Sequence, residues 1–574
     1  MGLALGSTPG LLFGLWGLGV NPLFHDSPLC YLLVCLLLPG LVLGALFGLV
    51  GDWRGAHRAV KGLLAFEAAA WLVMSLWPAP AADGVELLVF GIDGATYDVI
   101  DPMVEAGELP ALAEIQATGT HAVLESMEPM FSPLLWTTMA SGRPPEVHGV
   151  HGFHVQATDV QVPRFWDVAL AEGQSVGIYK WLVTYPPREV DGFIVPAWLA
   201  PAPETWPEEL SPVKELELSN RLKRRSVEAK RGSVELLLAA IAQGLRFSTV
   251  VEAAHWKLYE IVAKPTALER RRRLEHLRVS MDRDTFALAL IRHQPRVATF
   301  TDYATDGLAH IFWRWHQPEA YSDVDPAMVE RYGEVVRDAY RQADEVLAEM
   351  MELVGDDARI VVLSDHGFQP LLEGAANRSF FSPKTERLDA RLDEALGEVD
   401  VSRLGVKLTV AAVDPQIEVE ALRSYIEGLL DENGEPFFLV SEVPDAPRSL
   451  CLTFANEEVD EERIAAGTVG GEPMRAYAKL DDLYTGDHHA DGVFMARGPG
   501  IEQGEMERFG LLDVSPTIHG LMGISPAQDM PGVSQVIEME PGPLSRDSIV
   551  RGLSFGDGVD GVNEEQLRAL GYIQ

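Results

Sequence analysis

Hydrophobic and polar positions divide the chain into two parts of different character. Three long apolar stretches occur early, at 2–24, 29–50 and 59–77, whereas the apolar runs after residue 85 are short and alternate with polar segments. Because a helix needs about 20 apolar residues to cross a bilayer, the long stretches predict about three membrane helices, an anchor at 1–78. A cleaved signal peptide is the alternative for the beginning, but it lacks a basic n-region and leaves the later stretches unexplained.

Charges between the apolar stretches orient these predicted helices. The loop at 51–58 is basic, whereas the loop at 25–28 is not. Since Lys and Arg are enriched in cytoplasmic loops, we expect the N-terminus in the cytoplasm and everything after Trp77 on the extracytoplasmic side of the cytoplasmic membrane. Glu67 would then either face the helix bundle or mark an imperfect span.

The remainder of the chain has the pattern of an α/β domain. After a Pro- and Ala-rich linker at 79–84, an apolar run at 85–94 ends in Asp93-Gly94, which is typical of a buried strand with an acid at its carboxyl end. Similar runs recur at 121–125, 175–179, 192–196, 296–301, 359–364, 407–411, 437–440, 450–454 and 492–496. Helical patterns alternate with them, so we predict a large, mostly parallel sheet between helical layers over 85–574.

Two segments interrupt this alternation. Residues 204–292 are rich in helix formers and predict a helical insertion. Its basic runs at 221–225 and 270–273 could meet anionic lipid or substrate, but charged helix faces are more often simply solvated. Residues 371–483 are acidic and of mixed pattern, and we expect them to form an α/β cap over the site.

Composition excludes some functions. The chain has 46 Lys and Arg against 85 Asp and Glu, a net charge of −39, which argues against nucleic acid as the main partner because phosphate-backbone binding needs a basic surface. The three cysteines, Cys30, Cys35 and Cys451, indicate neither a disulfide framework nor a Cys-rich zinc site.

A candidate nucleophile lies at 131–143. Ser132 precedes Pro133, an apolar turn and Gly142, which predicts a short helix with Ser132 at the N-cap and Gly142 just past the end. Helix N-termini favour an alkoxide and bind phosphate-like anions, so Ser132 could accept a phosphoryl group. A purely structural capping serine is the simpler interpretation of this segment alone.

Candidate metal ligands follow the strand at 296–301. Asp306 and His310 are four residues apart, so a helix beginning there would place both side chains on one face, where they can hold one metal. Surface residues also occur at this spacing. Asp302 is a competing ligand or a residue that orients one.

Two further segments contain ligand-competent residues. Asp365 and His366 end the strand at 359–364, and His488 and His489 lie in a polar loop before 492–496. Each segment alone also fits an ordinary turn. Together with Asp93, Ser132 and the Asp306/His310 pair, however, they supply about the number of ligands that two cations roughly 4 Å apart require, with a hydroxyl between them.

These motifs resemble the alkaline phosphatase superfamily, most closely its type I phosphodiesterase and nucleotide pyrophosphatase branch. The matching stretches, in order, are GIDGATYD, FSPLLWTTMASGRPPEVHGVHGF, DGLAH, VLSDHGF and GDHHADGVFMARGPGI, with further similarity at 514–523 and 567–573. The resemblance covers the chain from Val85 onward except the two insertions and the membrane segment. It implies an alkaline phosphatase-like fold and two divalent metal ions, zinc by the family's example.

The resemblance also implies roles for individual residues. Ser132 would be the nucleophile between two metals, one held by Asp93, Asp365 and His366 and the other by Asp306, His310 and His488. Thr137 and Thr138 lie too far into the helix to be the nucleophile, and His488 is preferred to His489 because it follows the family's Gly-x-His spacing.

Two departures limit the substrate. The family's nucleotide pyrophosphatases carry an Asn where this chain has Leu135, which puts nucleotide diester specificity in doubt. No Cys-x-Pro-x-Arg stands near Ser132, which disfavours a formylglycine sulfatase.

We therefore expect a membrane-anchored, metal-dependent phosphoester hydrolase that acts by double displacement through a phosphoseryl intermediate. Its substrate would be a phosphoester small molecule, a lipid head group or an envelope glycan, next to membrane lipid. If an alcohol replaced water in the second step, the enzyme would be an envelope phosphotransferase. A non-catalytic binding protein of the same fold is the third alternative, although all seven positions carry ligand-competent residues.

Overall fold

The computed structural model describes residues 81–555 except 154, 225–232, 322–323, 372–380, 405–406, 443–447, 456–460, 481–484 and 541. The three predicted membrane helices fall within 1–80, outside these residues. Among the helices that are described, none is both long and apolar enough to span a bilayer.

A nine-stranded mixed sheet lies at the centre of the molecule, in the order β18-β2-β17-β6-β1-β5-β3-β4, with β19 also paired to β2. Its strands are β1 (Leu87–Ile92), β2 (Thr120–Glu125), β3 (Val176–Tyr179), β4 (Gly192–Val195), β5 (Val297–Asp302), β6 (Arg359–Leu363), β17 (Asp491–Arg497), β18 (Gly504–Glu505) and β19 (Phe509–Gly510). Strands β6, β1, β5, β3 and β4 are mutually parallel, and β17 runs antiparallel between β2 and β6. The predicted mostly parallel α/β sheet is confirmed.

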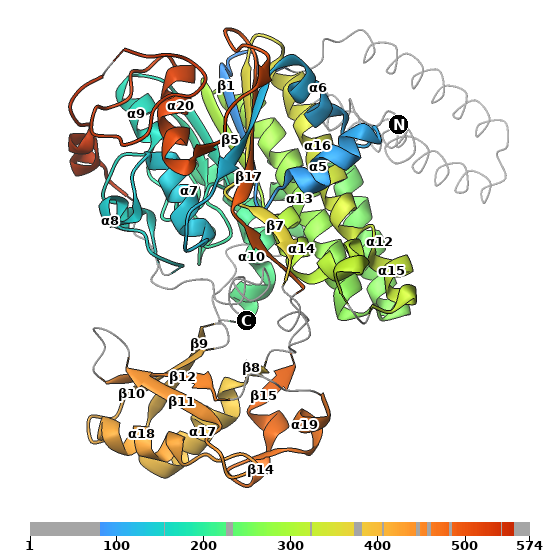
Figure 1. Cartoon of the computed structure of the whole chain (residues 1–574), viewed down its shortest axis with the longest axis vertical. Coiled ribbons are helices and arrows are strands. Elements are labelled where there is room, and N and C mark those ends of the chain that lie inside the picture. Colours follow the sequence, from blue (N-terminus) through green and yellow to red (C-terminus); the bar gives the residue numbers. More distant parts are fainter. Residues whose placement is uncertain are drawn as a thin grey trace, which may run out of the picture.

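Helices cover both faces of this sheet, as Figure 1 shows. One face carries α5 (Tyr97–Glu105), α6 (Pro110–Thr118), α13 (Ala267–His293), α14 (Ala304–His316) and α16 (Val335–Val354), and the other carries α7 (Ser132–Ser141), α9 (Phe165–Ala171) and α20 (Val514–Leu521). Alternate residues of β1 enter the two cores: Leu88 and Phe90 pack on the first side, Leu87 and Val89 on the second. Burial on both faces explains why β1 is a continuous apolar run.

The segment predicted as a helical insertion contains α10 (Ser211–Arg224), α11 (Ser233–Ala242), α12 (Phe247–Ala263) and α13. Helix α13 packs directly on β3, β4 and β5 and buries Phe286 and Leu290 completely. The last helix of this segment is therefore part of the layer that covers the sheet. Two short helices, α8 (Pro145–His148) and α15 (Pro326–Tyr332), complete the body.

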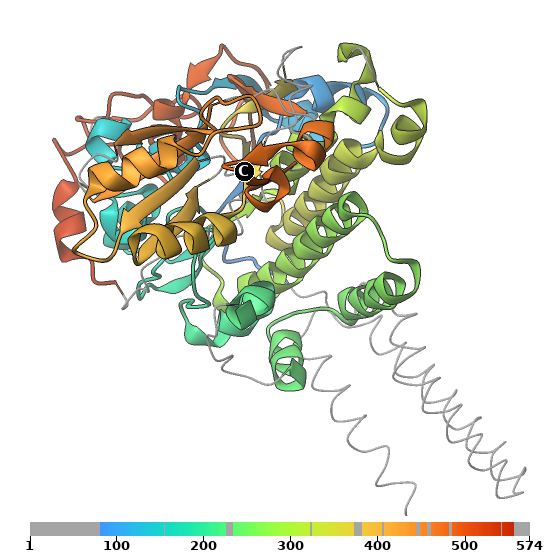
Figure 2. The same cartoon turned by 90° about the horizontal axis from the view of Figure 1, so that it is seen from below.

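Residues 381–480 form a second lobe with its own hydrophobic core, which lies below the body in Figure 1 and in front of it in Figure 2. Its antiparallel sheet, in the order β11-β12-β10-β9, is formed by β9 (Val399–Leu404), β10 (Lys407–Ala412), β11 (Phe438–Glu442) and β12 (Ser449–Phe454), accompanied by α17 (Thr385–Leu396), α18 (Val419–Glu427) and α19 (Glu461–Ala466). The chain leaves the body after β7 (Gly367–Pro370) and re-enters it at β16 (Gly486–His489), and these two strands pair antiparallel. The cap role of this lobe stays a prediction.

A buried carboxylate from α16 caps α6. Helix α6 has no side-chain cap of its own, and Asp344, which is only 2% exposed, accepts hydrogen bonds from the backbone N–H groups of Ala111 and Leu112 at 3.1 and 2.8 Å. These are the first N–H groups of the helix, because Pro110 has none. One side chain thus fixes the junction between the two helices.

Replacing Asp344 with Ala is expected to lower the free energy of unfolding by about 2–4 kcal/mol, because two buried donors lose their acceptor. Asp338→Ala on the same helix is the matched control. Asp338 forms only partly exposed ion pairs with Arg272 and Arg341, which are worth about 0–1 kcal/mol. Denaturant unfolding of both variants measures the difference, and equal losses would contradict the capping role.

Candidate active site

Three neighbouring parallel strands bring acidic residues to one edge of the sheet. Asp93 follows β1, Asp365 follows β6, and Asp306 lies four residues beyond β5. Strand β1 pairs with both β5 and β6, with Ile92 opposite Asp302 and Gly91 opposite Leu363. Because the carboxyl ends of parallel strands meet at the same edge, the three side chains converge, at the edge where open α/β sheets bind ligands.

The first candidate metal group consists of Asp306, His310 and His488. Asp306 and His310 share one side of α14, as predicted, with His310 Nε2 3.3 Å from Asp306 Oδ1. His488 Nε2 lies 3.3 Å from the same carboxylate oxygen and 3.1 Å from His310 Nε2. One oxygen and two imidazole nitrogens thus surround a common point, as a divalent cation requires.

The second candidate group consists of Asp93, Asp306 and His366. His366 Nε2 lies 3.5 Å from Asp93 Oδ1, 3.9 Å from Asp306 Oδ1 and 3.6 Å from Asp365 Oδ2. The rings of His366 and His488 stack, with centroids 3.6 Å apart. The six predicted ligands therefore form one continuous cluster, and Asp306 lies between its two halves. Their division into two sets of three stays a prediction.

The electrostatics of this cluster fit a cation. Asp93, Asp306, Asp365 and His366 are all fully buried. Among the described residues, neither carboxylate oxygen of Asp306 or Asp365 has a hydrogen-bond partner, nor has His366 Nε2. Buried polar atoms are normally hydrogen-bonded, so this set of unpartnered acceptors indicates positions for divalent metal.

Burial and mutual repulsion shift the titration of the carboxyls. Burial, followed by the charges of Asp365 and Asp306, raises the pKa of Asp93 well above its usual value. Burial and the charge of Asp306 raise the pKa of Asp365 to about 8. Burial also opposes ionisation of Asp306, but interactions with His310 and His488 outweigh it and lower the pKa of that carboxyl. Without added positive charge, the three carboxyls cannot all be ionised.

Backbone carbonyls fix the orientation of the three imidazoles. His310 Nδ1 donates to Gly486 O at 3.1 Å, His366 Nδ1 to Gly367 O at 3.0 Å, and His488 Nδ1 to Met130 O at 3.0 Å. A neutral imidazole that donates through Nδ1 presents Nε2 as an acceptor. In their neutral form, all three rings therefore offer an Nε2 lone pair to the cluster.

The indole of Trp136 orients the carboxylate of Asp93, a role that the sequence did not predict. Its indole Nε1 donates to Asp93 Oδ2 at 3.2 Å, and the Thr305 hydroxyl donates to Asp93 O at 2.5 Å. Trp136 lies four residues after Ser132, so both residues occur on the same side of α7. The only signal in the sequence was an indole N–H within a segment expected to be buried, because a buried Trp needs an acceptor.

Ser132 does not occupy the expected N-cap. Phe131 holds that position, and Ser132 is the first residue of α7, completely buried. Pro133 has no N–H, and the N–H groups of Leu134 and Leu135 both donate to Phe131 O. The helix terminus therefore offers fewer donors to an anion than predicted. Gly142 ends the helix with φ of 65°, as expected.

Two hydrogen bonds tie the start of α7 to the cluster. Trp136 reaches Asp93, and Met130, two residues before Ser132, accepts from His488. The start of α7 is thus attached to both halves of the cluster. This is where the sequence analysis places the nucleophile, Ser132.

The antiparallel pair of β7 and β16 differs from the sequence prediction for residues 486–489. Residues 486–489 form a strand, whereas a loop was predicted, and His489 Nδ1 accepts from the Asp491 N–H at 3.1 Å. Gly367 permits a close approach of the two backbones, because a Cβ there would lie 2.1 Å from Asp491 O.

Two other residues named in the sequence analysis, Asp302 and Leu135, lie outside the cluster. Asp302 Oδ1 accepts from the Ala304 N–H at 2.9 Å at the start of α14, and burial raises the pKa of Asp302 to about 7. Leu135 is completely buried in the core on the α7 side of the sheet.

The fold and the site together define an α/β enzyme with adjacent carboxylate and imidazole groups for metal at the carboxyl edge of its sheet. Residues 87–452 match the family model of type I phosphodiesterase / nucleotide pyrophosphatase. The chain belongs to this family, and it is a phosphoric ester hydrolase of a metal-dependent kind. The predicted family and enzyme class are confirmed.

Structural comparison finds, among others, phosphonoacetate hydrolase from Sinorhizobium meliloti 1021 in complex with phosphonoformate. The identity is 18%, the alignment covers 75% of this chain and 94% of that chain, and the TM-score is 0.35. A comparison with curated proteins finds no match.

We expect Trp136→Phe to weaken metal binding by about 10–100-fold, because Asp93 loses the donor that orients it. Trp166→Phe is the control, since Trp166 is also fully buried in the same core but does not contact the cluster. Titration of metal-depleted protein with zinc measures both affinities. Equal affinities in the two variants would show that the indole does not act through Asp93.

Proposed function

We propose that this chain is a membrane-anchored phosphoester hydrolase that uses two divalent metal ions and forms a phosphoseryl intermediate at Ser132. One observation carries the proposal: buried, unpartnered carboxylate oxygens and three oriented imidazoles surround a region to which the start of α7 is tied from both sides. Family membership supports the reaction class.

The chain's own residues perform the displacement as follows. The Ser132 Oγ attacks phosphorus in line, the bond to the leaving oxygen breaks, and a phosphoseryl ester forms. Bound divalent cations would lower the pKa of the attacking hydroxyl and neutralise charge on the phosphoryl and leaving oxygens. This charge stabilisation is needed because the N-terminus of α7 offers few free donors.

The second step determines the product. Attack of water on the phosphoseryl ester releases phosphate or a phosphomonoester and regenerates Ser132, which is hydrolysis. Attack of an alcohol transfers the phosphoryl group to a lipid or glycan instead, which is the alternative activity. A non-catalytic binding protein is disfavoured, because the chain belongs to an enzyme family and retains all seven ligand-competent positions.

The apolar stretches at 2–24, 29–50 and 59–77 support the location of this enzyme. They would anchor it in the cytoplasmic membrane with the catalytic domain on the extracytoplasmic side, where lipid head groups and envelope glycans accompany small phosphoesters as substrates. Leu135 in place of the family's Asn favours substrates other than nucleotide diesters.

Ser132→Ala is expected to reduce turnover of an aryl phosphodiester at least about 10³-fold with metal present, because the covalent intermediate cannot form. Ser141→Ala on the same helix is the control, since the Ser141 hydroxyl donates to Thr137 O at 2.7 Å and accepts from the Arg143 N–H at 3.3 Å, both of them backbone groups. Retention of full turnover by Ser132→Ala would refute the assigned nucleophile.

Asp306→Asn is expected to lower the affinity for both metals, because this carboxylate lies between the two halves of the cluster. Asp302→Asn should leave the metal content unchanged, since its interaction with Ala304 needs only an acceptor oxygen. Elemental analysis should give two divalent ions in the native chain. A chelator should abolish activity, and added zinc should restore it. One lost metal in Asp306→Asn would instead assign Asp306 to a single site.

A further inference from the structure

Exposed hydrophobic side chains concentrate in one segment of the chain, the helices α11 to α13. Of the 14 large hydrophobic side chains that are exposed among the described residues, half lie between residues 238 and 274. These are Leu238 of α11, Val251, Leu258, Tyr259, Ile261 and Val262 of α12, and Leu274 of α13. Soluble surfaces rarely gather so much apolar area, and such gathering marks a contact site.

Helix α12 has its apolar side turned away from the body. Val251, Leu258 and Val262 lie at positions i, i+7 and i+11, which form one stripe along a helix. Thr249, by contrast, donates to Asp284 Oδ2 at 2.5 Å, and Glu252 pairs with Arg273 at 2.6 Å. The polar side of α12 therefore faces α13 and its apolar side faces outward. In most surface helices the apolar side faces the body.

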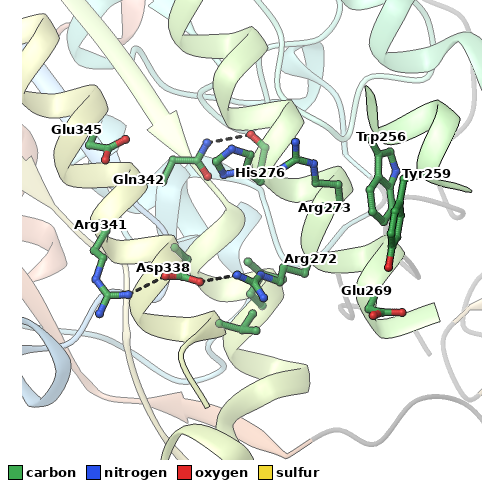
Figure 3. A pocket seen from close by; sticks show the side chains of 13 residues that line it. Trp256, Tyr259, Glu269, Arg272, Arg273, His276, Asp338, Arg341, Gln342 and Glu345 are labelled. Atoms are coloured by element: carbon green, nitrogen blue, oxygen red, sulfur yellow. Dashed lines mark hydrogen bonds and ion pairs between the residues drawn. The ribbon is translucent and has the colours of Figure 1, made fainter. Parts of the chain in front are cut away.

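A pocket of about 430 Å³, lined by charged, aromatic and aliphatic side chains, lies between the inner side of α12 and α16. Figure 3 shows Trp256 and Tyr259 along one wall, with Arg341 and Gln342 across from them. The two aromatic rings stack with centroids 5.3 Å apart. Among the residues of α12 with described burial, only Thr249 is buried. Hydrophobic burial against the body therefore contributes little to holding this helix.

The basic run at 270–273 is already paired within the body. Arg271 lies 3.3 Å from Glu275, Arg272 lies 2.7 Å from Asp338, and Arg273 contacts Glu252. The side chains of the other run, at 221–225, lie outside the described residues. Of the features in this segment, the apolar stripe is thus a better candidate for a contact surface than the arginines at 270–273.

The chain enters the body at the carboxyl end of α13, near the end of α11, whereas the carboxyl end of α12 lies beside the amino end of α13. Gln294, at the end of α13, donates from Nε2 to Ala81 O at 3.0 Å and accepts from the Gly84 N–H at 2.8 Å. Two residues earlier, Arg292 donates to Ala242 O, at the end of α11, at 2.9 Å. Only four peptide units separate Trp77 from Ala81, so they are at most about 14 Å apart.

We propose that the outer side of α12 rests on the lipid bilayer, with Leu258, Ile261 and Val262 in the boundary between head groups and acyl chains. The proposal rests on the membrane location given under Proposed function. An apolar stripe with flanking aromatic residues and lysines is typical of helices that lie in the interface, and Lys257 and Tyr259 flank the stripe here. Together with the predicted anchor, this contact gives the catalytic domain a fixed orientation on the membrane.

A fluorescent probe on the intact chain tests the contact. Val262→Cys, in a background where Cys30, Cys35 and Cys451 are Ser, is labelled with an environment-sensitive dye and reconstituted in phosphatidylcholine vesicles that contain lipids with a nitroxide high on the acyl chain. Leu544→Cys is the matched control, because Leu544 is 77% exposed and Val262 is 76% exposed. Leu544 lies three residues before the short 3-10 helix Asp547–Gly552, which contacts α9 on the opposite face of the central sheet from α13 and α12.

We expect the dye at Val262 to shift to the blue and lose fluorescence to the nitroxide lipid, and the dye at Leu544 to do neither. If the chain floats with the vesicles but both probes behave alike, the contact of α12 is refuted while the anchor stands. If the chain does not float, both the anchor and this contact are refuted. Quenching that disappears when protein is diluted into more lipid would refute the lipid contact in favour of a second copy of the chain.

Discussion

The burial of three carboxyl groups at one edge of the sheet is the constraint on which the site depends. Asp93, Asp306 and Asp365 are fully buried, and each has a carboxylate oxygen within 3.9 Å of His366 Nε2. Such a cluster is tolerable only where positive charge compensates it. The neighbouring contacts are consistent with that requirement, since three imidazoles and one indole are each oriented by a hydrogen bond.

The same contacts connect the proposed nucleophile to the metal groups. Helix α7 lies on one side of the sheet and α14 on the other, yet residues near the start of α7 bond to Asp93 and His488. The position of Ser132 is therefore determined by packing and hydrogen bonds of its neighbours as well as by the helix itself. In the proposed mechanism, charge stabilisation would come mainly from bound cations, because Pro133 has no N–H and the N–H groups of Leu134 and Leu135 donate to Phe131 O.

Strands and ligands differed in how well the sequence predicted them. Strands such as β1 and β6 were predictable within two residues, because burial on both faces leaves a continuous apolar run. Ser132 was misplaced by one position, since a cap depends on backbone angles that several residue types can adopt. Strand β16 was taken for a loop because its residues, Gly486 to His489, are polar, and it forms only by pairing with β7. Strand ends and spacing brought all six predicted ligands forward as candidates, and the family resemblance divided them into two sets and favoured His488 over His489.

The pairing of β7 with β16 has a mechanical consequence. This two-stranded ladder contains His488, directly follows His366, and continues in both directions into the second lobe. The two strands that connect the lobe to the body therefore also hold His488 and directly follow His366, two of the predicted ligands. His366 and His488 stack at this ladder with ring centroids 3.6 Å apart, so a movement of the lobe that displaced one strand of the ladder relative to the other would change the separation of the two imidazoles.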